Sequence, residues 1–310
     1  MAHELESMFF VGETPWHGLG KELKEAPDTE RAIIEAGLDW TVHAEPLYRI
    51  DGNPAQVRAQ CVVRDTDNRV LCDHVGPDWT VLQNKDGFKW FDPWVKAGEV
   101  TLETAGSLRE GSVVWILARM KRDPMVIGKG DEVLKYVLLT WGHGTMAVRA
   151  GMTGIRTVCM NTLRTAIESA DSQLLKLTHT EHVVENLEKV REIMDLANAQ
   201  FEATAEQYRW LASRGISELE LRRYVKVVTL AEDAKKETKT EKKVIELFQT
   251  GRGAELETAK GTWWGAYNAM AEYLTLERGK DQGRRLDNLW LGSGKQINKK
   301  AFETALRLAA

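Results

Sequence analysis

Residues 133–150, with the sequence Val-Leu-Lys-Tyr-Val-Leu-Leu-Thr-Trp-Gly-His-Gly-Thr-Met-Ala-Val-Arg-Ala, decide the fold class of this chain. Residues 133–141 and 145–150 are rich in the β-branched and aromatic residues that favour strands. The Gly-His-Gly segment at 142–144 separates them, and glycine permits a tight turn. The stretch therefore predicts an antiparallel β-hairpin.

Two more hairpins are predicted upstream of this one. Residues 57–64 and 69–75 flank an Asp-Thr-Asp-Asn segment, a composition typical of tight turns between strands. Residues 101–105 and 112–119 flank a loop that begins and ends with glycine. The first half of the chain is therefore expected to contain a sheet built from antiparallel hairpins.

Helices are expected to back these hairpins. Asn84 is a suitable N-cap for a short helix, and Pro93 requires that this helix bend or end early. Residues 155–160 lead into a second helix that ends near Ser169. Antiparallel hairpins backed by helices indicate an α+β domain, to which we assign residues 1–175.

The second half of the chain, residues 176–310, is expected to be mostly helical. Thr178 and Glu181 have the spacing of a capping box, and apolar residues then recur at three- and four-residue steps until Gly215. These apolar positions are Val183, Leu187, Val190, Met194, Ala197, Phe201, Ala205, Tyr208 and Leu211. The pattern predicts an amphipathic helix of about 34 residues. Its apolar face is suited equally to packing on the sheet and to pairing with another subunit.

Composition limits the class of protein. The chain has 310 residues, a net charge of −4, 43% hydrophobic residues and 28% charged residues, as in a folded globular protein. Its three cysteines are scattered, which fits a reducing compartment. The N-terminal segment has no signal-peptide pattern, and no run approaches the roughly 18 apolar residues of a membrane helix. We therefore expect a cytoplasmic protein with no membrane-spanning segment.

Eleven tryptophans are a further feature of the composition. A buried indole contributes a large apolar area, so most of them are expected in the core. Trp16, which follows Pro15, is one of these predicted core residues. One or two tryptophans could instead be platforms on which nucleic-acid bases stack.

Motifs for catalysis are lacking. The chain has no phosphate-binding loop, no nucleophile elbow and no His-Glu-x-x-His segment. His179 and His182 are three residues apart, but no third ligand is near, so we interpret them as exposed residues at a helix start. The sequence thus indicates a binding protein and predicts no cofactor and no metal site. An enzyme whose site is not a short motif is the alternative.

Basic residues identify the candidate site. Lys135, Arg149, Arg156 and Arg164 interrupt otherwise apolar segments of the third hairpin and the helix after it, and Trp141 lies at the turn. On a half-buried strand such side chains point to solvent, where several guanidinium groups would form a stripe for phosphates. We predict that these five residues form a nucleic-acid-binding site.

Two alternatives to this site stay open. The cations could be ordinary surface residues that pair with acids such as Glu132 or Glu168. The binding site could also lie in one of two basic stretches, residues 222–243 and 280–300.

Several segments, in one order, resemble a known family. They are Pro-Trp-His-Gly-Leu-Gly at 15–20, Gln-Asn-Lys-Asp-Gly-Phe at 83–88, Thr-Ala-Gly-Ser-Leu at 104–108 before Val-Trp-Ile-Leu-Ala-Arg at 114–119, Ile-Arg-Thr-Val-Cys-Met-Asn-Thr-Leu at 155–163 and Gly-Ala-Tyr-Asn-Ala at 265–269. Together they resemble the phage/plasmid-like protein family of unknown function, which is found in bacteriophages, prophages and conjugative plasmids. The resemblance covers most of the chain and implies a genomic setting rather than a reaction.

The order of the expected elements also resembles that of phage single-strand annealing proteins. In those proteins a hairpin and an adjoining helix line the groove for single-stranded DNA with basic residues, and the subunits assemble into rings or filaments. The resemblance implies that Arg149, Arg156 and Arg164 are groove residues here.

We therefore expect a homo-oligomer that binds single-stranded DNA and anneals it during phage or plasmid recombination or replication. The alternative is a protein-binding phage factor that modulates host defence or replication through host or phage replication proteins.

Overall fold

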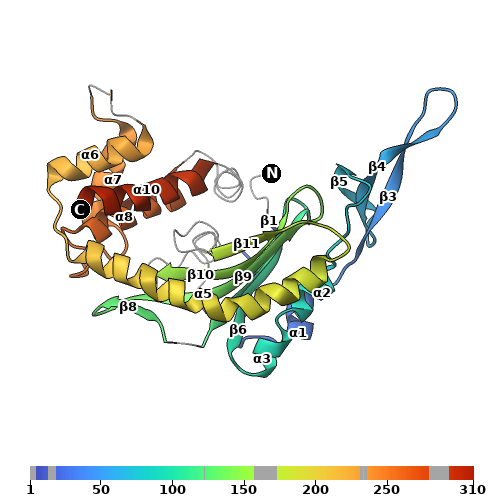
Figure 1. The fold of residues 1–310 in the computed structure, drawn as a ribbon, viewed down its shortest axis with the longest axis horizontal. Coiled ribbons are helices and arrows are strands. Elements are labelled where there is room, and N and C mark those ends of the chain that lie inside the picture. Colours follow the sequence, from blue (N-terminus) through green and yellow to red (C-terminus); the bar gives the residue numbers. More distant parts are fainter. Residues whose placement is uncertain are drawn as a thin grey trace.

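The computed structural model of this chain describes residues 5–12, 19–121, 123–156, 173–230, 233, 236–278 and 293–310 (Figure 1). At residues 153–156, 173–174, 191–203, 275–276 and 293–296 it describes the backbone alone. The protein has the predicted α+β architecture, with antiparallel strands followed by helices.

The main sheet has the strand order β11-β10-β9-β7-β6-β1-β2, and β8 pairs with β9 outside this path. Its strands are β1 (Leu5–Val11), β2 (Lys21–Leu23), β6 (Val100–Leu108), β7 (Val113–Met120), β8 (Met125–Gly128), β9 (Asp131–Gly142), β10 (Val148–Arg156) and β11 (Gln173–Leu177). Neighbouring strands are antiparallel, except that β1 and β2 are parallel. Short connections between antiparallel neighbours explain why local turn signals predicted much of this sheet.

The three predicted hairpins are confirmed, but the third is longer than expected. The β10 strand does not end at Ala150, because every residue from Arg149 to Arg156 pairs with a residue of β9. It therefore runs through Gly151 and Gly154, two residues that weaken a strand locally. The helix expected to end near Ser169 lies outside the described residues.

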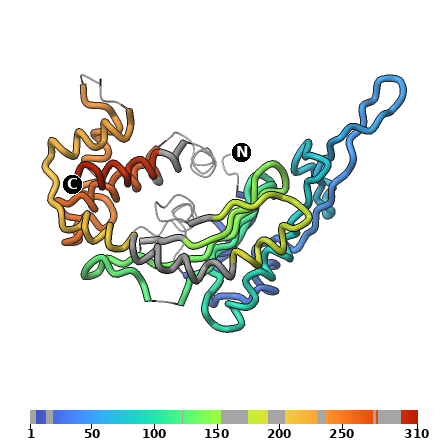
Figure 2. The backbone as a smooth tube through the Cα atoms, in the orientation of Figure 1, coloured from blue at the N-terminus to red at the C-terminus, as the bar shows by residue number. Residues whose placement is uncertain are grey.

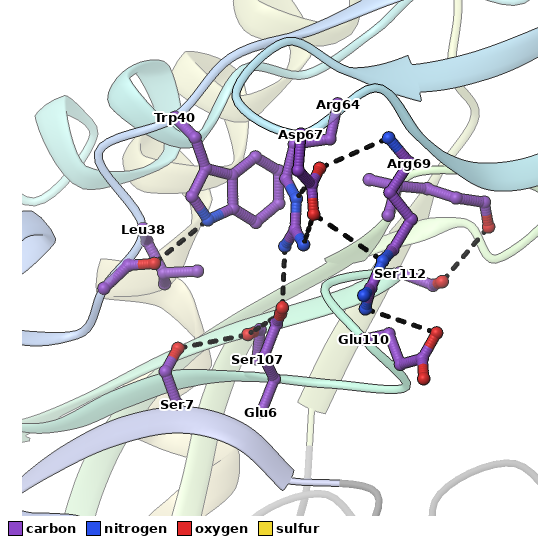
Figure 3. A network of polar contacts seen from close by, with 12 residues as sticks. Glu6, Ser7, Leu38, Trp40, Arg64, Asp67, Arg69, Ser107, Glu110 and Ser112 are labelled. Carbon is purple, nitrogen blue, oxygen red and sulfur yellow. Dashed lines mark hydrogen bonds and ion pairs between the residues drawn. The ribbon is translucent and has the colours of Figure 1, made fainter.

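A second sheet projects from the main body (Figure 2). It is antiparallel and consists of β3 (Val42–Arg49), β4 (Ala55–Arg64) and β5 (Arg69–Val75). Arg64, which is only 6% exposed, joins this sheet to β1. Its guanidinium donates to Glu6 at 2.8 Å and to the two carboxylate oxygens of Asp67 at 2.9 and 2.6 Å (Figure 3).

Three short helices lie beside the main sheet: α1 (Thr29–Glu35), α2 (Asn84–Lys89) and α3 (Asp92–Lys96). The helix predicted after Asn84 is thus divided in two, and Pro93 lies in the first turn of α3, where its missing N–H costs nothing. Asn84 is not the N-cap; Gln83 has that position. The Asn84 side chain is buried and donates to the carbonyl of Leu38 at 3.1 Å.

The long predicted helix is α5 (Val183–Ala212), 30 residues in length. Its N-cap is His182, whose side chain forms no capping bond, so the predicted Thr178–Glu181 capping box is wrong. Leu187 and Tyr208 are 1% and 3% exposed, and the indole of Trp90 donates to the Leu187 carbonyl at 2.8 Å. Where its side chains are described, the apolar face of α5 therefore packs within the chain instead of forming a seam between subunits.

The C-terminal part consists of α6 (Glu218–Thr229), α7 (Lys239–Thr250), α8 (Trp263–Glu272), the π-helical turn η2 (Tyr273–Glu277) and α10 (Ser293–Ala309). An aromatic cluster holds it together, with Tyr208 packed on Trp264 and Phe302. Trp264 also donates its indole N–H to the buried carboxylate of Asp131 at 2.9 Å. This bond ties the helices to the start of β9.

Most tryptophans of the described residues are core residues, as predicted. The buried ones are Trp40, Trp90, Trp115, Trp141, Trp263 and Trp264. Trp16 lies outside the described residues. Within the described ranges, the search for a helix both long enough and apolar enough to span a bilayer finds none.

Candidate functional site

The β9–β10 hairpin separates the predicted site residues between the two faces of the main sheet. Arg149 pairs with Thr140, whereas Arg156 pairs with Val133. Side chains alternate between faces along a strand, so Lys135 and Trp141, each an odd number of residues from Thr140, lie on the face opposite Arg149. The predicted site residues whose side chains the structure describes therefore do not share one face of the sheet.

Trp141 lies in the core rather than at an exposed turn. Its side chain is 0% exposed, and a methyl group on Gly87 of α2 would lie only 2.6 Å from its ring. A base cannot reach a ring that is covered in this way, because stacking requires an accessible face. Trp141 is therefore a packing residue in this conformation, contrary to its predicted role.

The remaining predicted cations differ in their surroundings. Lys135 is buried, at 6% exposed. Arg149 is half-buried, and burial lowers the pKa of its guanidinium; no carboxylate of the described residues opposes this shift. Its cross-strand neighbour on β11 is Lys176, a second cation. Arg164, and the side chain of Arg156, lie outside what the structure describes.

A more basic site lies among the C-terminal helices. Between α6, α7 and α10 is a hollow of about 990 Å³, called the basic hollow below. Its lining residues are Leu219, Arg222, Arg223, Lys226, Val227, Glu241, Lys300, Arg307 and Leu308. Five of these side chains are cationic and one is a carboxylate, in a chain whose net charge is −4. The hollow therefore concentrates positive charge on an acidic protein.

The sequence of α6 explains one wall of the basic hollow. Leu219, Arg222, Arg223 and Lys226 have the i, i+3, i+4, i+7 spacing that places side chains on one helix face. The opposite face is buried in the core. It consists of Leu221, Tyr224, Val225 and Val228. The helix start is fixed by Ser217, which forms a complete capping box with Glu220.

Arg222 is the cation of this wall that is already neutralised. It donates to Glu218 at 2.8 and 3.0 Å, to Glu237 at 2.5 Å and to Glu241 at 3.1 Å. These hydrogen bonds raise the pKa of its guanidinium, that of Glu237 most. Arg222 is therefore a structural link between α6 and α7 rather than a residue available to a ligand.

Helix α10 supplies the opposite wall. Lys300 and Arg307 are seven residues apart and so lie on the same face of this helix. Lys300 donates to the carbonyl of Val227, near the end of α6, at 2.5 Å. Neither Arg223 nor Arg307 forms an ion pair with any residue that the structure describes, and both are exposed. These two guanidinium groups are the available cations of the hollow.

His179 and His182 differ in their surroundings. His179 was predicted to be exposed, but it is 8% exposed, and its ring nitrogens lie 3.1 and 3.0 Å from the carbonyl oxygens of Thr80 and Met146. His182 is exposed beside Glu185. The described residues contain no group of three His, Cys, Asp or Glu side chains that could hold a metal ion.

A second buried histidine lies nearby. His143 is 0% exposed, and its Nε2 lies 2.9 Å from the Oδ1 of Asn84. Burial lowers the pKa of His143 to about 3, with smaller effects from the charges of His179 and Arg64. The ring is therefore neutral at physiological pH, and it serves packing and hydrogen bonding.

The basic hollow combines residues from both basic stretches of the sequence, 222–243 and 280–300. Sequence analysis missed Arg307, although its seven-residue distance from Lys300 was a usable signal. It also could not predict that α6 and α10 pack side by side, because that contact joins residues far apart in the chain.

Comparison with protein families finds one family that matches this chain. A family model described as "Domain of unknown function (DUF932)" matches residues 72–290, most of the chain. The chain belongs to the DUF932 family. The matched range runs from β5 through the main sheet and α5 into the C-terminal helices, so it includes α6 and α7 but ends before α10. No curated protein and no solved structure gives a significant match.

Proposed function

We propose that this DUF932 protein binds single-stranded DNA through the basic hollow. The single observation that carries the proposal is the charge of the described lining residues, five cations with one carboxylate on a protein of net negative charge. Phosphate contacts by Lys and Arg supply most of the affinity of non-specific nucleic-acid binding. A local basic surface is sufficient for this, because the position of charges matters more than their sum.

The lining of the hollow suits a single strand. It also includes the apolar side chains of Leu219, Val227 and Leu308. A flexible strand can place its phosphates on Arg223 and Arg307 and its sugars or bases on the apolar side chains. The binding we propose serves strand annealing in phage or plasmid recombination or replication, in the cytoplasm.

A salt titration with an unstructured oligonucleotide tests the proposal. Fluorescence anisotropy should show an affinity that falls steeply with salt. Arg223→Ala and Arg307→Ala should each weaken binding for all sequences and reduce the slope of log affinity against log salt by about 0.7, the single-strand value for one phosphate contact. A complementary oligonucleotide with a quenched label would then show whether bound strands anneal.

The chain offers a matched control on α10. Lys299 is 71% exposed and pairs with Glu303 at 3.8 Å, and it does not line the hollow. Lys299→Ala should leave both the affinity and the salt slope unchanged. If Arg149→Ala had the larger effect, the site would be on the sheet instead. If the intact protein bound no oligonucleotide at low salt, the proposal would be wrong, and the protein-binding alternative would remain.

A further inference from the structure

Arg149 and Lys176 form a pair of like charges on the main sheet. They lie directly opposite each other, because Arg149 of β10 pairs with Lys176 of β11, at one end of the strand order (Figure 1). The Cβ atoms of directly opposed residues lie about 4.5–5.5 Å apart, and two like charges in such positions destabilise a sheet. The fold therefore holds two cations together at an electrostatic cost.

The half-buried position of Arg149 adds to this cost. Burial lowers the pKa of its guanidinium, because the charged form loses part of its hydration. Neither Arg149 nor Lys176 forms a hydrogen bond or an ion pair with any residue that the structure describes. A guanidinium carries five N–H donors, and a partly buried one needs acceptors for them. An anion between the two side chains would supply both the acceptors and the opposite charge.

The neighbouring positions on the same face of the sheet supply no negative charge. Within the three strands, the same-face positions next to Arg149 are Thr140 on β9, Gly151 on β10 and Lys176 on β11. Thr140 is buried and donates its hydroxyl to the carbonyl of Val114 at 2.9 Å. Gly151 has no side chain. The two positive charges are therefore not neutralised by these neighbours.

The pair lies on the face of the sheet that is turned away from α2. Trp141 follows Thr140 on β9 and so points to the opposite face, where it packs against Gly87 of α2. Lys176 is exposed and Arg149 is half-buried, so water reaches both side chains from their own face. A small anion can approach the pair by the same route.

The chemistry of the two cations selects among anions. A guanidinium can bind two oxygens of a carboxylate or of a phosphate at once, whereas an ammonium group is a compact point charge. A carboxylate bound to Arg149 in this way has no further oxygen for Lys176, and the same holds for the two free oxygens of a phosphodiester. A terminal phosphate presents at least three oxygens and carries up to two negative charges. It is therefore the anion that matches both cations.

We propose that Arg149 and Lys176 form an anion site that binds a terminal phosphate, either free or as a monoester. The guanidinium of Arg149 binds two of its oxygens, and the ammonium group of Lys176 binds a third. The site is separate from the basic hollow, because its residues lie on β10 and β11, whereas residues of α6, α7 and α10 line the hollow. Either proposal can thus fail while the other holds.

Thermal unfolding of the full chain, with inorganic phosphate replacing chloride at constant ionic strength, is the measurement. Phosphate at about ten times its dissociation constant should raise the melting temperature of the wild type by about 2 °C. Arg149→Ala should lose this gain. Lys176→Glu places a carboxylate opposite Arg149, so it should raise the melting temperature without phosphate and remove the gain with phosphate. Because Lys176 is exposed, this variant should keep the fold.

Two control variants locate the bound phosphate. Lys129 is an exposed lysine in the turn between β8 and β9 of the same sheet, and Lys129→Glu makes the same change of net charge as Lys176→Glu. It should keep the phosphate gain and should not raise the melting temperature without phosphate. Arg223→Ala, in the basic hollow, should also keep the gain. A gain lost in Arg223→Ala but kept in Lys176→Glu would place the phosphate in the hollow and overturn the proposal.

Three further ligands test the chemical class of the anion. Thymidine 5′-monophosphate should stabilise the wild type through the same two residues if the site accepts monoesters, whereas an effect of inorganic phosphate alone would assign the site to free phosphate. Acetate and a dinucleotide with a single phosphodiester should have little effect. An equal gain from either of these, lost in Lys176→Glu, would overturn the assignment to a terminal phosphate. So would a wild-type protein whose melting temperature phosphate does not change.

Discussion

The guanidinium carbon of Arg64 lies 5.1 Å from the centroid of the Trp40 ring. The same guanidinium donates to Glu6 of β1 and to Asp67 of the β4–β5 turn (Figure 3). Arg64 thus holds three separate segments around one planar group, whose five N–H donors suit it to this role. An alanine methyl group at Gly111 would lie only 2.8 Å from a guanidinium nitrogen of Arg64, so a side chain at position 111 does not fit beside Arg64.

Replacing Arg64 should loosen the second sheet. Arg64→Ala removes hydrogen bonds to two carboxylates, and such charged bonds contribute about 1.5–3 kcal/mol each before screening. Because Asp67 is 39% exposed and Glu6 27% exposed, we expect a loss of about 2–3 kcal/mol in the free energy of unfolding. Urea denaturation measures it. Arg64→Lys keeps the charge but cannot form the two-bond contact with Asp67, so it should fall between the wild type and the alanine variant.

Trp141 should report on stability rather than on DNA binding. Its ring is buried against Gly87, so Trp141→Ala should cost about 3–5 kcal/mol of stability, as other large core deletions do. Gly87→Ala probes the same contact from the other side. It should cost about 1–3 kcal/mol, because the added methyl overpacks the site. Thermal unfolding followed by circular dichroism checks both. A Trp141→Ala variant with wild-type stability and reduced oligonucleotide affinity would restore the stacking interpretation.

The sequence predicted those features that local signals determine. The Asp-Thr-Asp-Asn turn correctly indicated the β4–β5 hairpin, and the apolar spacing correctly indicated α5. Strand β10 was predicted to end at Ala150, before Gly151 and Gly154, and glycine has a weak preference for strands. Pairing with β9 overrides this local preference and carries the strand to Arg156.

The burial of His143 predicts loss of stability in acid. Burial lowers its folded-state pKa to about 3, below the value of about 6.5 in an unfolded chain. Between these values the unfolded chain binds a proton that the folded chain does not, so stability falls as pH falls. The slope should approach about 1.4 kcal/mol per pH unit below about pH 6.5. Burial also lowers the pKa of His179, which adds in the same direction.

Urea denaturation at a series of pH values measures this slope. His143→Gln keeps a polar group beside Asn84 but does not titrate, so its stability should depend less on pH between about 6.5 and 4. His74 is exposed, and its replacement by Gln is the control. If the free energy of unfolding had the same pH dependence in the wild type and in His143→Gln, His143 would not be buried in its neutral form.

Only part of the basic hollow could be predicted from the sequence. The spacing of Arg222, Arg223 and Lys226 places them on one helix face, and this can be derived from the sequence alone. The neutralisation of Arg222 cannot be derived in this way, because it depends on how α6 and α7 pack. The carboxylates involved are Glu218, Glu237 and Glu241. Counting charges along residues 222–243 therefore overstates the cations available to a ligand.

Glu241 provides the last test, because it opposes the proposed ligand. Among the described residues that line the hollow it is the one carboxylate, it is 2% exposed, and its Oε2 has no hydrogen-bond partner there. Glu241→Gln removes a negative charge near the proposed phosphate path while keeping the size of the side chain. A unit charge about 4 Å away contributes about 1 kcal/mol in water, so oligonucleotide affinity should rise about two- to fivefold at low salt. The gain should shrink as salt increases.

The matched control for Glu241→Gln is Glu303→Gln on α10. Glu303 is 62% exposed and lies outside the hollow, beside Lys299. Both variants change the net charge of the protein by the same amount, so a general electrostatic effect would strengthen binding equally in both. Anisotropy titrations at two salt concentrations separate the cases. A larger gain for Glu241→Gln locates the nucleic acid at the hollow. Equal gains, or a weaker Glu241→Gln variant with unchanged stability, would place the nucleic acid elsewhere on the molecule.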